Sequence, residues 1–247
     1  MSQTPRIYHP SRLEESKPVL LDEQASRHLL KVLRLRPGAD LILFNNRGGE
    51  YQARLEEGSR DQAIVNITAF THSERESHLQ IHLAQVIARG ERMDQIIQKA
   101  VELGVHRFTP LTSARCGVRL EPAKAAKRLA HWQGVIVSAC EQCGRNRLPE
   151  MDICTDLMSW LGPPAIDEGL RLTLHPEAGK RLSDLSPPQG RRVTLLIGPE
   201  GGLTESEVAT AEGFGFDTIT LGPRVLRTET AGMATVASLQ ALWGDFS

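Results

Sequence analysis

Ile197-Gly-Pro-Glu-Gly-Gly-Leu203 and Leu221-Gly-Pro-Arg-Val-Leu-Arg-Thr-Glu-Thr230 are the two stretches that decide how the C-terminal part of this sequence is read. Each follows a short apolar run that is typical of a buried strand, and a third such run ends in Leu174-His-Pro-Glu177. Open α/β sheets bind ligands at the carboxyl ends of their strands, and glycines let a ligand approach the backbone closely. We therefore expect these three loops to form one ligand-binding site.

The sequence contains neither of two common patterns for binding nucleotide phosphates. A nicotinamide dinucleotide requires Gly-x-Gly-x-x-Gly early in a strand–helix–strand unit, and a P-loop requires Gly-x-x-x-x-Gly-Lys-Ser/Thr. Both patterns are missing. We therefore expect a ligand that is held mainly by backbone groups and apolar contacts.

Strands and helices alternate through residues 73–247, which predicts an α/β domain with helices on both faces of the sheet. A capping box at Thr204-Glu-Ser-Glu207 predicts the start of one helix, and Gly244 ends the last one. The expected strands are 79–87, 105–111, 170–174, 193–197 and 218–221, and the other expected helices are 91–103, 228–243 and a long one from Pro122.

The first 72 residues predict a smaller, β-rich domain, a barrel or a sheet. Its expected strands are 41–44, 50–55 and 63–70, which are rich in β-branched residues. Between Asp22 and Leu35 the pattern is helical, with four apolar residues expected on one face: Ala25, Leu29, Val32 and Leu33. A polar stretch at 71–78 lacks apolar periodicity, so we place the domains at 1–72 and 73–247.

The composition is that of a folded globular protein, because 40% of the 247 residues are hydrophobic and 24% are charged. The net charge is −1, and residues 1–72 carry 10 Lys and Arg against 9 Asp and Glu. A near-neutral chain argues against a general RNA coat. We find no apolar run of about 18 residues, no signal-peptide core and only four irregularly spaced cysteines. We therefore expect a cytoplasmic protein without membrane contact.

Positive charge is nevertheless concentrated locally, which RNA binding requires. Arg27, Lys31 and Arg34 fall at positions i, i+4 and i+7, which predicts one shared helix face. A second cluster comprises Arg115, Arg119, Lys124, Lys127 and Arg128, and a third comprises Arg145 and Arg147. Each cluster alone is typical of a solvated face, and together they predict a basic groove.

The two C-terminal stretches resemble the motifs of the SPOUT superfamily of RNA methyltransferases, and within it the bacterial enzymes that methylate uracil N3 of 16S ribosomal RNA. The similar segments also include Arg6-Ile-Tyr-His-Pro10, Arg89-Gly-Glu-Arg-Met93, Gln98-Lys-Ala-Val-Glu-Leu-Gly104 and Glu141-Gln-Cys-Gly-Arg-Asn-Arg147. The resemblance implies a PUA-like β-barrel at 1–72, a SPOUT α/β domain with a deep trefoil knot at 73–247, and a homodimer. Generic rules of chain topology would not predict the knot.

The resemblance further implies S-adenosyl-L-methionine as cofactor, no metal, and 16S ribosomal RNA in the small ribosomal subunit as substrate. The residues that would form the cofactor site are Leu174, His175, Ile197, Gly198, Pro199, Glu200, Gly201, Gly202, Leu221, Gly222, Leu226 and Thr230. The expected RNA contacts are Arg6, Arg27, Lys31, Arg34, Arg89, Arg115, Arg145 and Arg224. Gly232 lies inside a predicted helix, where close packing or approach of the cofactor would explain it.

The implied reaction requires the loss of the uracil N3 proton, so a base or groups that stabilise the uracil anion are needed. Arg227 is our candidate for stabilising negative charge on a uracil carbonyl. Glu229 could take the proton, position Arg227, or only complement the helix dipole. Arg6 enters as a third catalytic candidate through the resemblance alone.

Other functions stay open at this point. Within the same superfamily, the target could be a ribose 2′-hydroxyl or a transfer RNA. A protein of another class, a non-catalytic RNA-binding assembly factor, would have the same fold but no methyl transfer. A nicotinamide oxidoreductase is disfavoured because its phosphate-binding pattern is missing.

Overall fold

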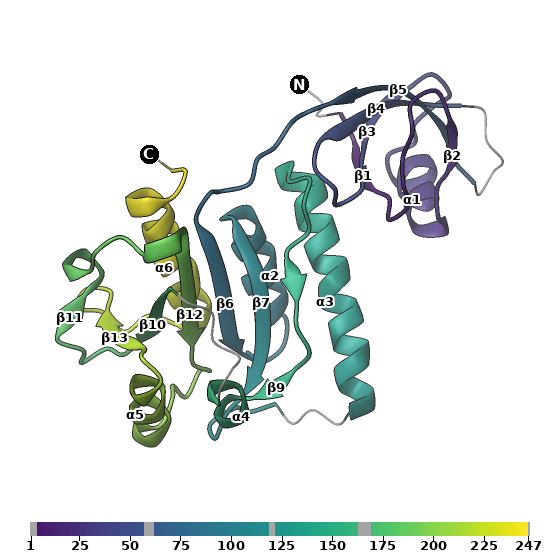
Figure 1. The fold of residues 1–247 in the computed structure, drawn as a ribbon. Helices are drawn as coiled ribbons and strands as arrows, with labels where there is room; N and C mark the ends of the chain where they lie inside the picture. The colour runs from purple at the N-terminus through teal and green to yellow at the C-terminus, as the bar shows by residue number, and fades with distance from the viewer. Residues whose placement is uncertain (1–3, 57–61, 119–121, 163–168, 247) are drawn as a thin grey trace. The chain divides into compact units, whose positions relative to one another are not determined.

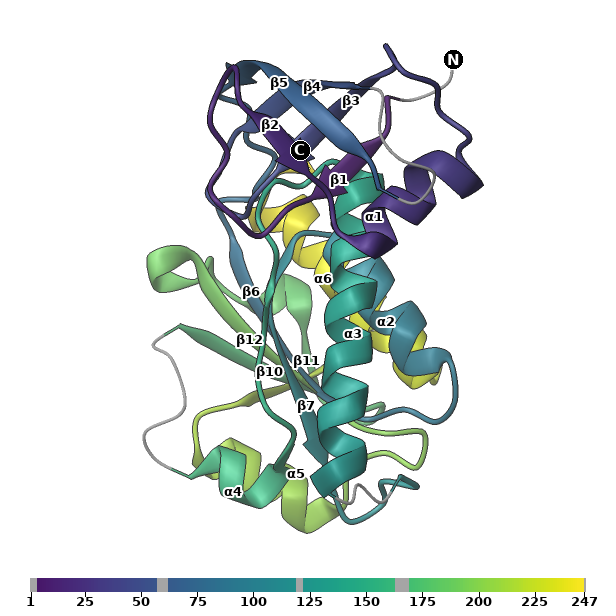
Figure 2. The same cartoon turned by 90° about the vertical axis from the view of Figure 1, so that its right-hand side faces the viewer.

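The structure is a computed structural model that describes residues 4–56, 62–118, 122–162 and 169–246 (Figures 1 and 2). The chain divides into two compact units. Unit 1 comprises Met1–Glu76 and Cys140–Leu148, and unit 2 comprises Ser77–Ala139 and Pro149–Ser247. The segment Cys140–Leu148 therefore belongs to unit 1 although it lies far along the chain. The continuous domains 1–72 and 73–247 stay a prediction.

Unit 1 contains one sheet whose strand order among the described residues is β1-β3-β4-β5-β2. The strands are β1 (Arg6–Tyr8), β2 (Pro18–Leu20), β3 (Asp40–Phe44), β4 (Glu50–Leu55) and β5 (Ile64–Thr71). All neighbours are antiparallel except β1, which is parallel to β3. The three strands expected from the sequence are present. The two edge strands were missed because three residues are too few to show a hydrophobic period.

The helix of unit 1 differs from the expected one. It consists of α1 (Glu23–Arg27) and a π-helical turn, η1 (His28–Val32), in which the Leu33 N–H bonds to the His28 carbonyl. Leu29 is buried as expected, but Val32 and Leu33 are 63% and 40% exposed. The prediction of one face containing all four apolar residues is wrong, because a π turn advances the side chains differently from the 3.6-residue period.

Unit 2 is built on a sheet in which every described strand pair is parallel. The strand order is β11-β13-β10-β12-β6-β7-β8, and β9 also pairs with β7. The bounds are β6 (Gln80–Val86), β7 (Val105–Thr112), β8 (Glu150–Met151), β9 (Thr155–Asp156), β10 (Leu170–Leu174), β11 (Lys180–Arg181), β12 (Arg192–Ile197) and β13 (Asp217–Thr220). The five strands expected in this region are all present.

Helices cover both faces of the unit 2 sheet. Ala84 and Leu196 pack in one cluster with residues of α4 and α5, whereas the next residues along their strands, Gln85 and Ile197, lie beneath Gly232 of α6. This alternation confirms the α/β architecture predicted from the sequence. The helices are α2 (Arg92–Glu102), α3 (Pro122–Cys143), α4 (Leu157–Leu161), α5 (Glu205–Gly213) and α6 (Thr228–Trp243), with short 3-10 turns η2 (Leu182–Asp184) and η3 (Gln189–Arg191).

Gly232 is buried inside α6, and the structure leaves room there for a methyl group. A Cβ atom would lie 3.6 Å from Ile197 Cγ1 and 3.7 Å from Gln85 Oε1, which are ordinary contacts. We expect Gly232→Ala to raise the free energy of unfolding by up to about 1 kcal/mol, because alanine favours a helix over glycine. Urea unfolding would measure this change. Gly198→Ala, which makes the same change at a glycine outside α6, is the control. A Gly232→Ala protein less stable than wild type would contradict the prediction.

Across residues 4–56, 62–118, 122–162 and 169–246, no helix has the length and apolar character that crossing a membrane requires.

Candidate active site

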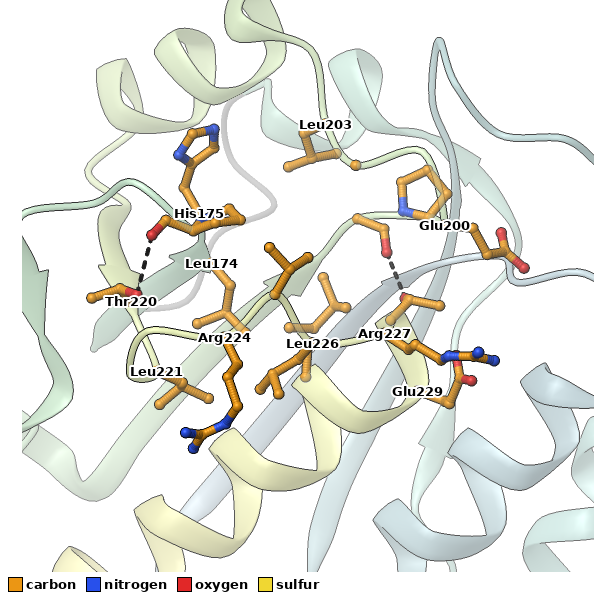
Figure 3. A pocket seen from close by; sticks show the side chains of 18 of the residues that line it. Leu174, His175, Glu200, Leu203, Thr220, Leu221, Arg224, Leu226, Arg227 and Glu229 are labelled. Atoms are coloured by element: carbon orange, nitrogen blue, oxygen red, sulfur yellow. Dashed lines mark hydrogen bonds between the residues drawn. The ribbon is translucent and has the colours of Figure 1, made fainter.

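A cavity of about 460 Å³ lies in unit 2 where β10, β12 and β13 end (Figure 3). Its walls come from the three loops that follow these strands, around Leu174, Ile197 and Leu221. Because the three strands are neighbours in a parallel sheet, their carboxyl ends meet at one edge. The cavity has the size of a small-molecule site. The loops expected to form one site therefore do lie together.

Nine of the twelve predicted cofactor residues line this cavity: Leu174, His175, Ile197, Gly198, Pro199, Glu200, Gly202, Leu221 and Leu226. The role of the other three stays a prediction. Gly201 lies beside Arg115, Gly222 forms the turn after β13 with a φ of 77°, and Thr230 is exposed on α6. Thr230 does not line the cavity, although its neighbours Glu229 and Ala231 do.

Several lining residues were missed by the sequence analysis: Arg92, Pro176, Leu203, Ile219, Thr220, Val225, Thr228 and Ala231. Most of them stand inside or beside the quoted motifs, so the motifs were a sufficient signal for the region. Arg92 is different, because it comes from α2, more than 100 residues before the motif that begins at Ile197. The pairing of β6 with β12 and the packing of α2 against α6 bring its helix to the cavity.

Gly198 leaves less room for a side chain than the other glycine of the wall, Gly202. A Cβ atom on it would lie 3.1 Å from both the backbone nitrogen and Cγ of Leu203. Any side chain larger than hydrogen would therefore push against the loop that carries Leu203. This packing explains the glycine that directly follows β12.

A buried hydrogen-bond chain joins this loop to the sheet and to α6. The Thr228 hydroxyl donates to the Gly198 carbonyl at 2.6 Å, and it accepts from Gln85 Nε2 at 3.1 Å (Figure 3 draws the first bond). Gln85 also donates to the Val86 carbonyl at 2.8 Å. Thr228 and Gln85 are almost completely buried. These hydrogen bonds therefore fix the direction of the Gly198 carbonyl beside the cavity.

Thr228→Val should disturb this arrangement. The substitution keeps the shape of the side chain but removes both hydrogen bonds, so buried polar groups lose their partners at a cost of about 1–3 kcal/mol. We expect lower stability in urea unfolding together with weaker binding, in calorimetry, of the cofactor that the resemblance implies. Thr228→Ser retains the hydroxyl and is the control. Wild-type cofactor affinity in Thr228→Val would show that the Gly198 carbonyl needs no such support.

The acidic edge of the cavity consists of Glu200, Glu229 and the arginine between them, Arg92. Glu200 Oε1 accepts hydrogen bonds from the Arg89 N–H at 2.9 Å and from the Arg92 guanidinium at 2.8 Å. Glu229 Oε1 lies 3.9 Å from Arg92 Nε. Partial burial raises the pKa of Glu200, but these hydrogen bonds outweigh it, and the net pKa is below its usual value. Glu200 is therefore ionised at neutral pH.

Two other arginines line the cavity without an acidic partner. Arg224 and Arg227 are exposed, and within the described part of the chain neither forms an ion pair or a side-chain hydrogen bond. Figure 3 shows both on the loop between β13 and α6. A guanidinium with free donors is suited to carboxylates, phosphates and other anionic oxygens. The cavity thus carries an acidic edge and two unpaired cations.

Two family models match this chain. The RNA methyltransferase domain matches residues 75–240, and the RNA methyltransferase PUA domain matches residues 21–68. The chain belongs to this family of RNA methyltransferases. Its membership confirms the resemblance found in the sequence and the combination of a PUA-like domain with a SPOUT α/β domain.

Relatives are similar over nearly the whole chain. Ribosomal RNA small subunit methyltransferase E of Buchnera aphidicola (Schizaphis graminum) is 35% identical over 243 residues, 98% of each chain. The solved structure of ribosomal RNA small subunit methyltransferase E from Neisseria gonorrhoeae, bound to S-adenosyl methionine, is 40% identical with a TM-score of 0.92. A Legionella pneumophila methyltransferase with bound SAM is 41% identical with a TM-score of 0.94. Both structures match over 99% of this chain and 100% of theirs.

Arg6 requires a correction, since it was expected to contact RNA or the reacting base. Its guanidinium is buried in unit 1, where it bonds to Glu50 at 2.6 Å, Asn146 Oδ1 at 2.5 Å and the Gly144 carbonyl at 3.2 Å. It also lies 5.3 Å from the centre of the Phe44 ring. Arg6 therefore holds the segment Cys140–Leu148 against the sheet of unit 1 and presents no surface to RNA.

Arg145 is a second correction among the expected RNA contacts. It is 4% exposed, and its guanidinium donates to both carboxylate oxygens of Glu76. Its neighbour Arg147 is paired with Glu74 at 2.9 Å. Glu74 and Glu76 come from the polar stretch at 71–78, which was expected only to mark a domain boundary. The third basic cluster is thus a set of ion pairs inside unit 1.

The remaining expected RNA contacts are exposed. Arg27 and Lys31 lie on α1 and η1, but Arg34 follows the helix with a φ of 54°, so the expected common helix face ends before it. Arg89 packs against the backbone of Gly117, and Arg115 donates to the Gly201 and Leu203 carbonyls. Arg119 lies outside the described residues. In the described part of the chain, no group of His, Cys, Asp and Glu could hold a metal.

Proposed function

We propose that this chain uses S-adenosylmethionine to methylate N3 of one uridine in 16S ribosomal RNA, with the assembled small subunit as substrate. The observation that carries the proposal is the cavity itself, which the family motifs line with an acidic edge and with two arginines that have no acidic partner among the described residues. The names of the relatives support a small-subunit ribosomal RNA target.

The residues around the cavity fit S-adenosylmethionine. When bound, this cofactor supplies a methyl group on a positively charged sulfur. Leu174, Leu221 and Leu226 offer apolar walls, and the loop at 197–203 offers closely approachable backbone groups. Glu200 and Glu229 add negative charge at one edge, which favours a cationic ligand. Our proposed cofactor site comprises the nine motif residues that line the cavity, Glu200 among them, together with Glu229 and the predicted Gly201, Gly222 and Thr230.

Arg227 and Glu229 are the proposed catalytic residues. Glu229 would accept the uracil N3 proton, and Arg227 would stabilise the negative charge that then develops on a uracil carbonyl. Glu229 is paired with Arg92 and has no hydrogen bond to Arg227 among the described residues, which disfavours the alternative that it only positions Arg227. Arg224 would bind a phosphate beside the target base.

The proposed RNA surface of unit 1 comprises Arg27, Lys31 and Arg34. Changing all three to glutamate should weaken binding to small subunits, because about three phosphate contacts are lost. The dependence of log affinity on log salt should also become shallower by roughly 2–3. Filter binding at several salt concentrations would measure both effects. The control changes Arg12, Lys17 and Arg54, which already have acidic partners. An unchanged salt slope in the first variant would remove unit 1 from the interface.

Three properties implied by the resemblance complete the proposal: domains at 1–72 and 73–247, a deep trefoil knot in the second domain, and a homodimer in the cytoplasm. Sedimentation at several concentrations would test the dimer. A monomer at the concentrations where methyl transfer is measured would contradict it.

The direct test is methyl transfer to small subunits from a strain that lacks the homologous enzyme. Labelled S-adenosylmethionine supplies the methyl group, and mass spectrometry of digested RNA locates it. We expect one 3-methyluridine in 16S ribosomal RNA and much less transfer to protein-free RNA. A 2′-O-methylated ribose or a modified transfer RNA would contradict the base and substrate assignments. Failure to bind S-adenosylmethionine at millimolar concentration would favour a non-catalytic RNA-binding protein.

A further inference from the structure

Arg92 occupies an electrostatically unusual position. It is the first residue of α2, where the positive end of the helix dipole disfavours a cation. Its guanidinium extends to the cavity and lies between two carboxylates from different elements, Glu200 on the loop after β12 and Glu229 in the first turn of α6. The stability of α2 therefore does not explain an arginine here, whereas the two acids do.

Glu200 serves as the anchor of this arrangement. Its Oε1 atom accepts from the Arg89 backbone N–H at 2.9 Å, so the carboxylate is fixed to the turn that precedes α2. The same oxygen accepts from Arg92 at 2.8 Å. Glu200 thus fixes the guanidinium of Arg92 from one side. The Nε atom of Arg92 faces Glu229.

Glu229 is held more loosely. Its Oε1 lies 3.9 Å from Arg92 Nε, beyond hydrogen-bond length, and no other described residue donates a hydrogen bond to its carboxylate. The side chain is nevertheless only 17% exposed. A largely buried carboxylate that keeps its lone pairs free beside a cavity can accept a proton from a ligand.

We propose that Arg92 is a positioning residue, which orients the Glu229 carboxylate toward the cavity and ties it to the loop that carries Glu200. The inference rests on the proposed function for the role of Glu229. The bridge couples three elements, the start of α2, the loop after β12 and the first turn of α6. Misplacing a catalytic group by about 1 Å can cost as much as a hundredfold in rate.

The test compares Arg92→Met, Arg92→Lys and a matched control, Lys99→Met, which removes a lysine on the same helix that pairs with Glu102. We expect Arg92→Met to lower kcat roughly tenfold and to leave the Kd for S-adenosylmethionine within about twofold of wild type. Arg92→Lys should recover most of the rate because a cation remains between the acids. Wild-type kcat in Arg92→Met, or no recovery with lysine, would overturn the proposal.

A double variant tests whether Arg92 acts through Glu229. In Arg92→Met with Glu229→Gln, we expect kcat to equal that of Glu229→Gln alone, because the residue to be positioned is already lost. Two effects that multiply would overturn the proposal. Glu200→Gln should reproduce part of the Arg92→Met defect, since it removes the anchoring charge.

A spectroscopic measurement separates this inference from the proposed function. The side-chain carboxyl carbon resonances of Glu200 and Glu229, observed by NMR without RNA or cofactor, should both move in Arg92→Met and stay unchanged in Lys99→Met. An unmoved Glu229 resonance would overturn the positioning role even if methyl transfer is confirmed. Conversely, a wild-type protein that transfers no methyl group while both resonances move would contradict only the proposed function.

Discussion

Replacing Arg227 with alanine is expected to lower kcat for methyl transfer by roughly 10²- to 10³-fold. This is the range seen when one group that stabilises developing negative charge is removed from an active site. The uracil ring gains a full negative charge when N3 loses its proton, and Arg227 is a cavity-lining cation that no described acid neutralises. Its charge is therefore available to the reacting base.

The effect should appear in kcat and hardly at all in cofactor binding. Arg227 is the residue that precedes α6, and its side chain forms no cap hydrogen bond, so its loss should leave the fold of the loop intact. We expect the Kd for S-adenosylmethionine to stay within about twofold, because the apolar walls and the Gly198 loop are untouched. Single-turnover methylation of small subunits, with calorimetry beside it, would measure both quantities.

Arg224→Ala provides the matched comparison, because Arg224 stands three residues earlier on the same loop and is equally unpaired. A phosphate-binding role predicts a higher KM for RNA with nearly normal kcat at saturation. Arg227→Lys should retain part of the rate, since the charge remains but the planar fork of donors is lost. An Arg227→Ala enzyme with wild-type kcat would remove Arg227 from the catalytic residues.

The cavity could be predicted from the sequence because its walls are local. The motifs around Ile197 and Leu221 each follow a strand directly, and neighbouring parallel strands necessarily end at the same edge. What could not be predicted depends on contacts between distant residues. Arg92 reaches the cavity through the pairing of β6 with β12 and the packing of α2 against α6, and nothing in the local sequence around Arg92 indicates those contacts.

The errors in unit 1 have the same origin. Charge clusters read from the sequence look solvated, but Arg145 finds Glu76 some 69 residues away, and Arg6 finds Asn146 some 140 residues away. Local pattern also failed at Val32, where a π turn replaced the regular helix and exposed the side chain. A basic residue in the sequence therefore gives evidence of RNA binding only after its acidic partners have been located.

Arg6→Met is expected to lower the free energy of unfolding by about 3–5 kcal/mol, the usual cost of breaking a buried ion pair from one side. The Arg6 and Glu50 side chains are only 4% and 13% exposed. Methionine fills a similar apolar volume but satisfies neither Glu50 nor Asn146 Oδ1. Urea unfolding would measure the loss, and hydrogen exchange would locate it in unit 1.

The comparison with Arg75→Met makes this prediction specific to burial. Arg75 bonds to the same two acceptors, Glu50 Oε2 at 3.3 Å and the Gly144 carbonyl at 2.9 Å, but its side chain is 47% exposed. Exposed ion pairs contribute about 0–1 kcal/mol, so this variant should be nearly as stable as wild type. Equal losses in the two variants would show that burial is not what makes Arg6 important.

The pH dependence of the Arg6→Met effect gives a second check. Burial raises the pKa of Glu50, but the hydrogen bonds and charges of Arg6 and, to a smaller extent, Arg75 outweigh it, so the net pKa lies below its ordinary 4.5. A carboxyl with a lowered pKa in the folded state adds stability above its unfolded pKa and loses it as the pH falls. The gap between wild type and Arg6→Met should therefore be widest at neutral pH and narrow below about pH 4.5. A variant with unchanged stability but weaker RNA binding would return Arg6 to the RNA interface.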